Sequence, residues 1–120
     1  MPLNDTAKNL MLEELATVAV WVSLHDGVPG ATGINELAGG GPAYARKQIA
    51  WSAAAAGLLD DSTDGLAFDV PAAADVTHCG FWSAAAAGTF YGSDDVTAEA
   101  FVGQGTYTLN DAKISLPDPA

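Results

Sequence analysis

The chain has 120 residues, 49% of them hydrophobic, and its 15 acidic and four basic side chains give a formal net charge of −11. A chain of this length predicts one domain, spanning residues 1–120, with a real hydrophobic core and no room for a second. Its negative charge would repel a phosphate backbone, so we expect no nucleic-acid binding.

The sequence also predicts the compartment in which the chain is made. Its apolar runs are interrupted well short of the roughly 20 residues that cross a bilayer, so no membrane association is expected. Its first residues lack the basic region of a signal peptide. The single cysteine, Cys79, cannot form an internal disulfide. Together these features favour synthesis in a reducing cytoplasm.

The first predicted element is a helix over residues 3–16. Asn4 or Asp5 can cap its N-terminus. One apolar stripe recurs at helical spacing and consists of Ala7, Leu10, Met11 and Leu15. Such a stripe is typical of the buried face of a helix.

Strands are predicted from residue 18 onward, because the hydrophobic period changes there from helical to two. In the first strand, residues 18–25, one strongly apolar face holds Val18, Val20, Val22 and Leu24. Asp26-Gly27 ends this strand.

Residues 26–43 are predicted to form a long loop, because the span contains six glycines and two prolines. Loops of this length in a small domain are usually functional. Two readings stay open: a surface excursion pinned by Ile34 and Leu37, or an interface with another chain. The candidate interface residues are Val28, Ile34, Leu37 and Tyr44.

A seven-residue repeat follows. Trp51–Gly57 recurs unchanged as Trp82–Gly88. Four alanines favour a helix by propensity, but a helix this short is not stable alone. We therefore predict a strand over residues 44–54 and a turn in each repeat, with no helix through 53–56 or 84–87.

The centre of the predicted fold is a hairpin over Val76–Gly92. Both faces of its first arm carry an aromatic residue, so both are expected to be covered and Trp82 to be buried. Further strands are expected at residues 66–70 and 106–109, with a last one holding Ile114 and Leu116. A turn is expected over residues 58–65. The 66–70 strand then leads back to the Val76 arm, which would give three successive antiparallel strands, and an exposed acidic stretch at 94–99 follows the hairpin.

About seven short strands behind one helix predict a mainly β fold, an antiparallel β-sandwich or jelly-roll-like domain. Its aromatic residues are expected to form the core first, although a carbohydrate groove would use the same residue types.

The sequence offers two weak metal-site patterns. Residues 60–65 resemble half of a calcium loop, but Pro71 stands where the twelfth-position acid belongs. His25, His78 and Cys79 lack the paired spacing of a zinc site. We expect no metal and no cofactor, a hydrogen-bonded His78 and a structural Cys79.

Catalytic residues are not predicted either. Ser23, His25 and Asp26 are the residue types of a catalytic triad, but adjacent strand positions point apart. We therefore expect no enzymatic activity.

Seven segments, in order along nearly the whole chain, resemble a family of small bacteriophage virion proteins. They are AKNLML in the helix, VSLHDG after it, YAR, FDVP, TH-x-G-x-W, GTFYG and GTYTL. The family is commonly described as tail-fibre-like or minor tail proteins, and some members resemble capsid-associated accessory proteins.

This resemblance implies a non-enzymatic structural protein of the virion, made in the host cytoplasm. Its implied partners are other tail or capsid proteins and further copies of itself, as a homo-oligomer. Two alternatives stay open: a capsid decoration or minor capsid protein, and a host-glycan-binding module.

Overall fold

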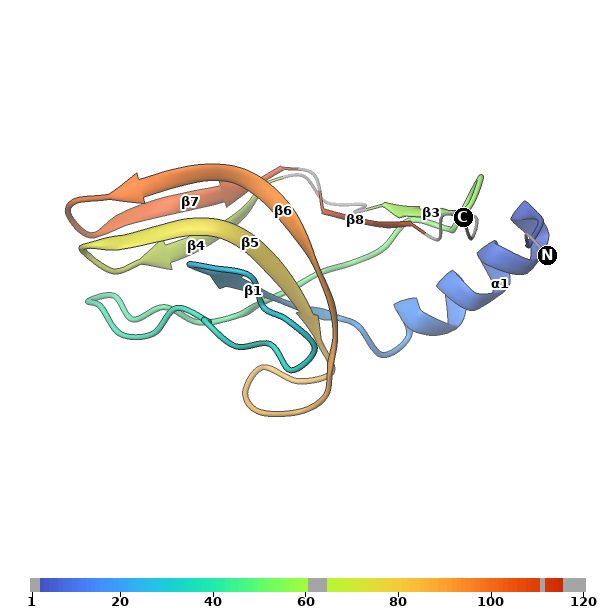
Figure 1. Ribbon diagram of the computed structural model, residues 1–120, viewed down its shortest axis with the longest axis horizontal. Coiled ribbons are helices and arrows are strands. Elements are labelled where there is room, and N and C mark those ends of the chain that lie inside the picture. Colours follow the sequence, from blue (N-terminus) through green and yellow to red (C-terminus); the bar gives the residue numbers. More distant parts are fainter. Residues whose placement is uncertain (1–2, 61–64, 111, 116–120) are drawn as a thin grey trace.

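The computed structural model describes residues 3–60, 65–110 and 112–115. Within these residues the chain forms one helix and eight strands: α1 (Asp5–Ala16), β1 (Trp21–His25), β2 (Lys47–Gln48), β3 (Leu58–Asp60), β4 (Leu66–Val70), β5 (Ala74–Trp82), β6 (Phe90–Phe101), β7 (Gly105–Leu109) and β8 (Lys113–Ser115). The molecule measures 47 × 27 × 25 Å. Figure 1 shows a body of β-strands and, at one end, an arm made of α1, β3 and β8.

The body is a small antiparallel sandwich. One layer is a four-stranded sheet in the order β2-β1-β5-β6, and the other is the pair β4-β7, which lies behind β5 and β6 in Figure 1. Phe68 and Tyr107 from the second layer share one core with Val22, Val76 and Phe81 from the first. The predicted fold class, a mainly β sandwich with an N-terminal helix, is confirmed.

The predicted central hairpin is also present. β5 pairs with β6 along most of its length, with Cys79 opposite Asp94 and Phe81 opposite Gly92. On its other edge β5 pairs with β1, so it is an interior strand. Trp82 is 8% exposed, as predicted for a strand covered on both faces.

Both alanine repeats form turns, and neither lies in a helix. Each ends in two residues with positive φ: Ala56 (53°) with Gly57 (73°), and Ala87 (53°) with Gly88 (79°). In the first repeat, the amides of Ala55 and Leu58 each donate to the other's carbonyl, at 3.0 and 2.9 Å. Two successive left-handed residues match the twist of a hairpin. The repeat is therefore a shared turn sequence.

The pairing of the later strands differs from the prediction. β4 pairs with β7, with Phe68 opposite Tyr107, and not with β5, so the predicted run of three successive antiparallel strands is not formed. Residues 58–60, predicted as part of a turn, form β3 and pair with β8. The reason is burial: pairing with β7 places Phe68 and Val70 in the core between the layers. The acidic stretch 94–99 lies within β6 and does not follow it.

The strand predicted over residues 44–54 is reduced to β2. The Ile49 amide still donates a hydrogen bond to the carbonyl of Val20, the residue just before β1 (2.8 Å). Trp51 then turns inward, and its indole donates to the Ala19 carbonyl at 2.8 Å. A side chain has replaced the backbone ladder there. β8 ends at Ser115, and Leu116 lies outside the described residues.

The apolar face predicted for the helix is only partly buried: Leu15 packs against the core, but the most buried residues lie on a neighbouring face. Leu12 and Lys8 are buried, whereas Leu10 and Met11 are exposed. α1 packs against the short strand β3 in the arm and not across the sandwich, so a narrow contact face is enough. Among the described residues, no helix is both long and apolar enough to cross a membrane.

Candidate functional site

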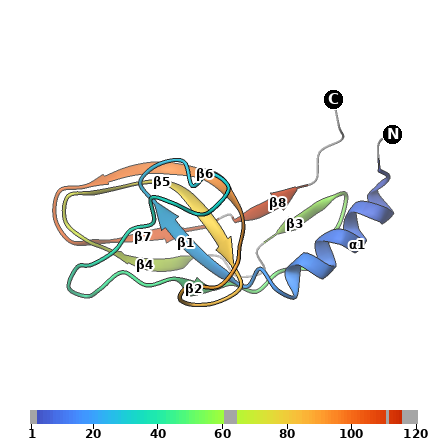
Figure 2. The same ribbon diagram turned by 60° about the horizontal axis from the view of Figure 1, so that its bottom comes forward.

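The 26–43 loop lies against the body beside β1, as Figure 2 shows. Its backbone is bonded to the strand: the Leu37 amide donates to the Leu24 carbonyl at 3.0 Å. It also folds on itself, because the amides of Gly33 and Ile34 both donate to the Pro29 carbonyl at 3.0 Å. This explains why β1 is buried on both faces, although one apolar face was predicted.

Arg46 connects this loop to a second loop, residues 83–89. Its guanidinium forms a two-point ion pair with Glu36, from Nε to Oε2 (2.9 Å) and from Nη2 to Oε1 (2.8 Å). Its Nη1 donates to the carbonyls of Ala84 and Ala87, both at 2.9 Å. The planar fork of arginine suits such convergent acceptors. One buried side chain therefore fastens two loops.

Tyr44 also binds the Glu36 carboxylate of this ion pair. Its hydroxyl donates to Glu36 Oε2 at 2.8 Å and accepts from the Leu24 amide at 2.9 Å. Burial alone would raise the pKa of Glu36, but the hydrogen bonds from Arg46 and Tyr44 outweigh it and hold that pKa below its ordinary value. Glu36 is therefore a carboxylate at neutral pH, as its role in the pair requires.

A second anchor is a buried chain of hydrogen bonds. Trp82 Nε1 donates to Ser23 Oγ (2.8 Å), Ser23 Oγ lies 2.6 Å from His25 Nε2, and His25 Nδ1 lies 2.8 Å from the Ile34 carbonyl. A carbonyl only accepts, so Nδ1 carries the proton and Nε2 accepts from the Ser23 hydroxyl. Burial is the main reason that the pKa of His25 is lowered, which agrees with a neutral ring.

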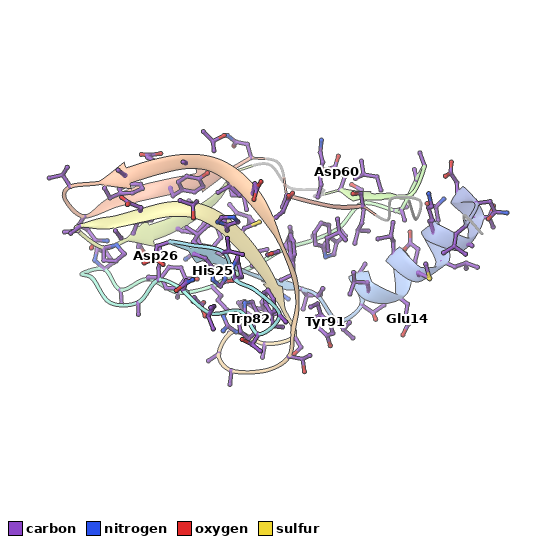
Figure 3. All side chains as sticks on the ribbon, in the orientation of Figure 1. Glu14, His25, Asp26, Asp60, Trp82 and Tyr91 are labelled. Carbon is purple, nitrogen blue, oxygen red and sulfur yellow. The ribbon has the colours of Figure 1, made fainter. Side chains whose placement is uncertain are left out.

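Gly80 provides the space for this chain. A Cβ at that position would lie 2.7 Å from Ser23 Oγ and 2.8 Å from His25 Nε2. Figure 3 shows His25 and Trp82 in the body, with Glu14 far away on the arm.

Ser23 and His25 are in contact because residues two apart on a strand share a face, so the argument from adjacent positions separates only His25 from Asp26. Their contact is nevertheless closed to substrate, since both side chains are fully buried. Asp26 is exposed, and the Ile34 carbonyl occupies the histidine nitrogen that an acid would need. The arrangement holds the loop in place.

The structure separates the four candidate interface residues into two pairs. Val28 and Ile34 are 66% and 58% exposed, whereas Leu37 is 6% exposed and belongs to the core. Tyr44 is committed to Glu36 and Leu24. Of the two side chains that one reading used to pin the loop, Leu37 is in the core, whereas Ile34 is exposed and contributes backbone hydrogen bonds.

The anchors missed by sequence reasoning are polar. The 26–43 loop is held in place less by apolar side chains than by polar ones, namely Glu36, Arg46 and the Ser23–Trp82 contact. One signal was available: Arg46 is the sole arginine of a strongly acidic chain, and such a residue next to a long loop invites a carboxylate partner from it.

The remaining predicted ligands are dispersed. Among the described residues, no group of three or more His, Cys, Asp or Glu side chains could hold a metal. His78 is bonded to Thr77 Oγ1 (2.8 Å) and Asp95 (3.0 Å), as expected of a hydrogen-bonded histidine. Burial raises the pKa of Cys79 to about 12, so it is a structural thiol. Most of the predicted calcium loop, residues 61–64, lies outside the described residues.

The fold and its anchors define a small acidic β-sandwich whose buried polar groups fasten its own surface loops. A comparison with protein families finds that residues 4–114 match the family described as podophage GP4 fiber I protein gp80. The chain belongs to this family and is a tail-fibre-like structural protein of a bacteriophage. No curated protein matches it.

Proposed function

We propose that this protein is a non-enzymatic component of the phage tail that works through protein contacts, in the manner of a minor tail protein. The family match over residues 4–114 is the observation that carries this proposal. The burial of the Ser23–His25 pair supports it, because this serine–histidine contact, of a kind that can activate a nucleophile, is not accessible to a substrate.

We propose further that the 26–43 loop is a contact surface. Its two exposed apolar side chains, Val28 and Ile34, are held on a backbone that the Arg46–Glu36 pair and His25 already fix. A preordered loop loses little conformational entropy when it binds. Burying the two apolar side chains in a contact would remove apolar surface from water, which is favourable. Its neighbour in the particle would be another tail protein or a further copy of this chain in a homo-oligomer.

Purified virions test the location. Mass spectrometry should find the protein in a low, fixed copy number, and cross-linking should join it to tail proteins. A copy number matching the capsid lattice, with cross-links to the major capsid protein, would instead identify a capsid decoration protein. Absence from the particle would refute the proposal.

Substitution tests the loop. Val28→Asp and Ile34→Asp should fold normally but enter virions poorly. Leu10→Asp is the matched control, because Leu10 is equally exposed (69%) but lies on the arm. Normal incorporation of both loop variants would exclude the loop as the contact. A host-glycan-binding role predicts the reverse pattern: normal incorporation with loss of adsorption to host cells.

A further inference from the structure

The sandwich is open along one side. The four-stranded sheet ends at β6, and β7 pairs with β4, so among the described strands neither has a second neighbour. β6 and β7 are consecutive, joined by residues 102–104, yet they do not pair with each other. One hydrogen bond links them across the gap, from the Tyr107 hydroxyl to the Thr97 carbonyl (2.7 Å).

A groove of about 670 Å³ lies along this side and is called the seam here. One wall consists of β6 residues between Asp94 and Glu99, the other of β7 residues 107–109 with Asn110, and Lys113 of β8 also lines the groove. Figure 1 shows the two strands curving together along the upper edge of the body. The seam is therefore long, open and bounded by strand edges.

The backbone of β6 is suited to accept another strand. It runs for 12 residues, longer than most strands in proteins. The Asp95 amide donates to the side chain of Asp94 (2.9 Å), a local bond that a neighbouring strand can replace. An exposed strand edge of this kind is a template for pairing with an extended segment.

Charge decides which segment fits. The seam carries three exposed acids, Asp94, Asp95 and Glu99, and one half-buried base, Lys113, so acidic side chains predominate in it. A second copy pairing at β6 would set acids against acids, and like charges on paired strands are unfavourable. A basic segment would meet complementary charge.

We propose that the seam receives an extended segment of another virion protein, one that alternates basic and apolar residues and adds as a strand to β6. This inference rests on the proposed role of the chain as a docking component of the particle. Because Asp94 and Asp95 point to opposite faces of β6, the basic side chains would lie on the side of Asp95 and Glu99, and the alternate apolar ones would enter the groove on the side of Asp94, towards Tyr107.

The probe is an eight-residue peptide of alternating valine and lysine, titrated into the isotopically labelled protein. We expect NMR shift changes confined to β6 and β7, with slower hydrogen exchange in β6. The same peptide with glutamate in place of lysine, or with a central proline, should not bind. Shifts spread over α1 or the 26–43 loop, or no shifts at all, would overturn the proposal.

A double variant, Asp94→Asn with Asp95→Asn, tests the charge. Because exposed ion pairs contribute modestly, the peptide should bind about three- to tenfold more weakly. Wild-type binding should also weaken as salt is raised. The control is Glu14→Gln with Asp5→Asn, which removes equal charge on the arm, away from the seam and from the 26–43 loop, and should change binding by less than about twofold.

Equal peptide binding by both double variants would show that the acidic side chains of the seam do not contribute to binding, and it would refute the inference. A second result would also refute it: the Asp94/Asp95 variant self-associates, while the wild-type protein does not bind the peptide. In that case the acidic side chains would serve only to keep copies of the chain apart. Peptide binding is measured on the isolated protein and virion location on particles, so failure here can be told apart from failure of the proposed function.

Discussion

The guanidinium of Arg46 lies 3.8 Å from the ring centroid of Trp82. The same guanidinium binds Glu36 of the 26–43 loop and two carbonyls of the 83–89 loop, while the indole donates to Ser23. This stacked pair joins both anchors of the loop surface. Its removal should therefore loosen both loops at once.

Trp82→Ala should destabilise the protein strongly. Trp82 is 8% exposed and packs against Phe90 at a centroid distance of 5.0 Å, so its truncation leaves a large cavity worth about 3–5 kcal/mol. Denaturant unfolding measures this. Trp82→Phe, which keeps most of the volume, should lose clearly less. A loss below about 1 kcal/mol for the alanine variant would mean that the indole is not part of the core.

Glu36→Gln should destabilise the 26–43 loop more than the core. The substitution leaves Arg46 buried without its counter-charge, at a cost of about 1–3 kcal/mol. Hydrogen exchange of the Leu37 amide should quicken, while exchange in β5 changes little. Glu14→Gln, an exposed change of the same kind on the helix, should stay within about 0.5 kcal/mol. If hydrogen exchange at the Leu37 amide were unchanged, the ion pair would not be what holds the loop in place.

Gly80→Ala should be disruptive, because its Cβ would lie 2.7 to 2.9 Å from Ser23, His25 and Phe90. Overpacking of this kind costs about 1–3 kcal/mol. Gly92→Ala is the matched control on the neighbouring strand, since nothing lies within 4 Å of its Cβ position. Equal melting temperatures for the two variants would contradict the close packing around the Ser23–His25 contact.

Acid should weaken the fold through His25. Burial lowers its folded pKa below the ordinary value of 6.5, so between these two pKa values the unfolded state binds more protons. The free energy of unfolding should thus fall as the pH drops below 6.5, by up to about 1.4 kcal/mol per pH unit. Above that pH the contribution is constant.

Denaturant melts at pH 7.5 and 5.5 measure this slope, and His25→Gln should reduce it. If that variant does not fold, an NMR titration of the His25 ring in the wild-type protein decides the question. A measured pKa at or above 6.5 would rule out the neutral, Nδ1-protonated histidine assigned here.

Local patterns in the sequence were sufficient for several elements. The capped helix, the alternation of residues 66–70 and the hairpin at 76–92 follow from residue spacing. The turns of the two alanine repeats also follow locally, since four alanines cannot sustain a helix between a strand and a glycine. These features depend on interactions between near neighbours in the chain, which a sequence displays directly.

The tertiary structure decided strand partners and the loop anchors. β4 pairs with β7 across a sequence gap of more than 30 residues, and only the shared core selects that partner over β5. Arg46 finds Glu36 and the 83–89 loop, and Trp82 finds Ser23, 59 positions away. Polar side chains carry no periodic signal in the sequence, because their partners depend on which distant segments the folded backbone places side by side. Burial then makes each contact strong enough to hold the loop.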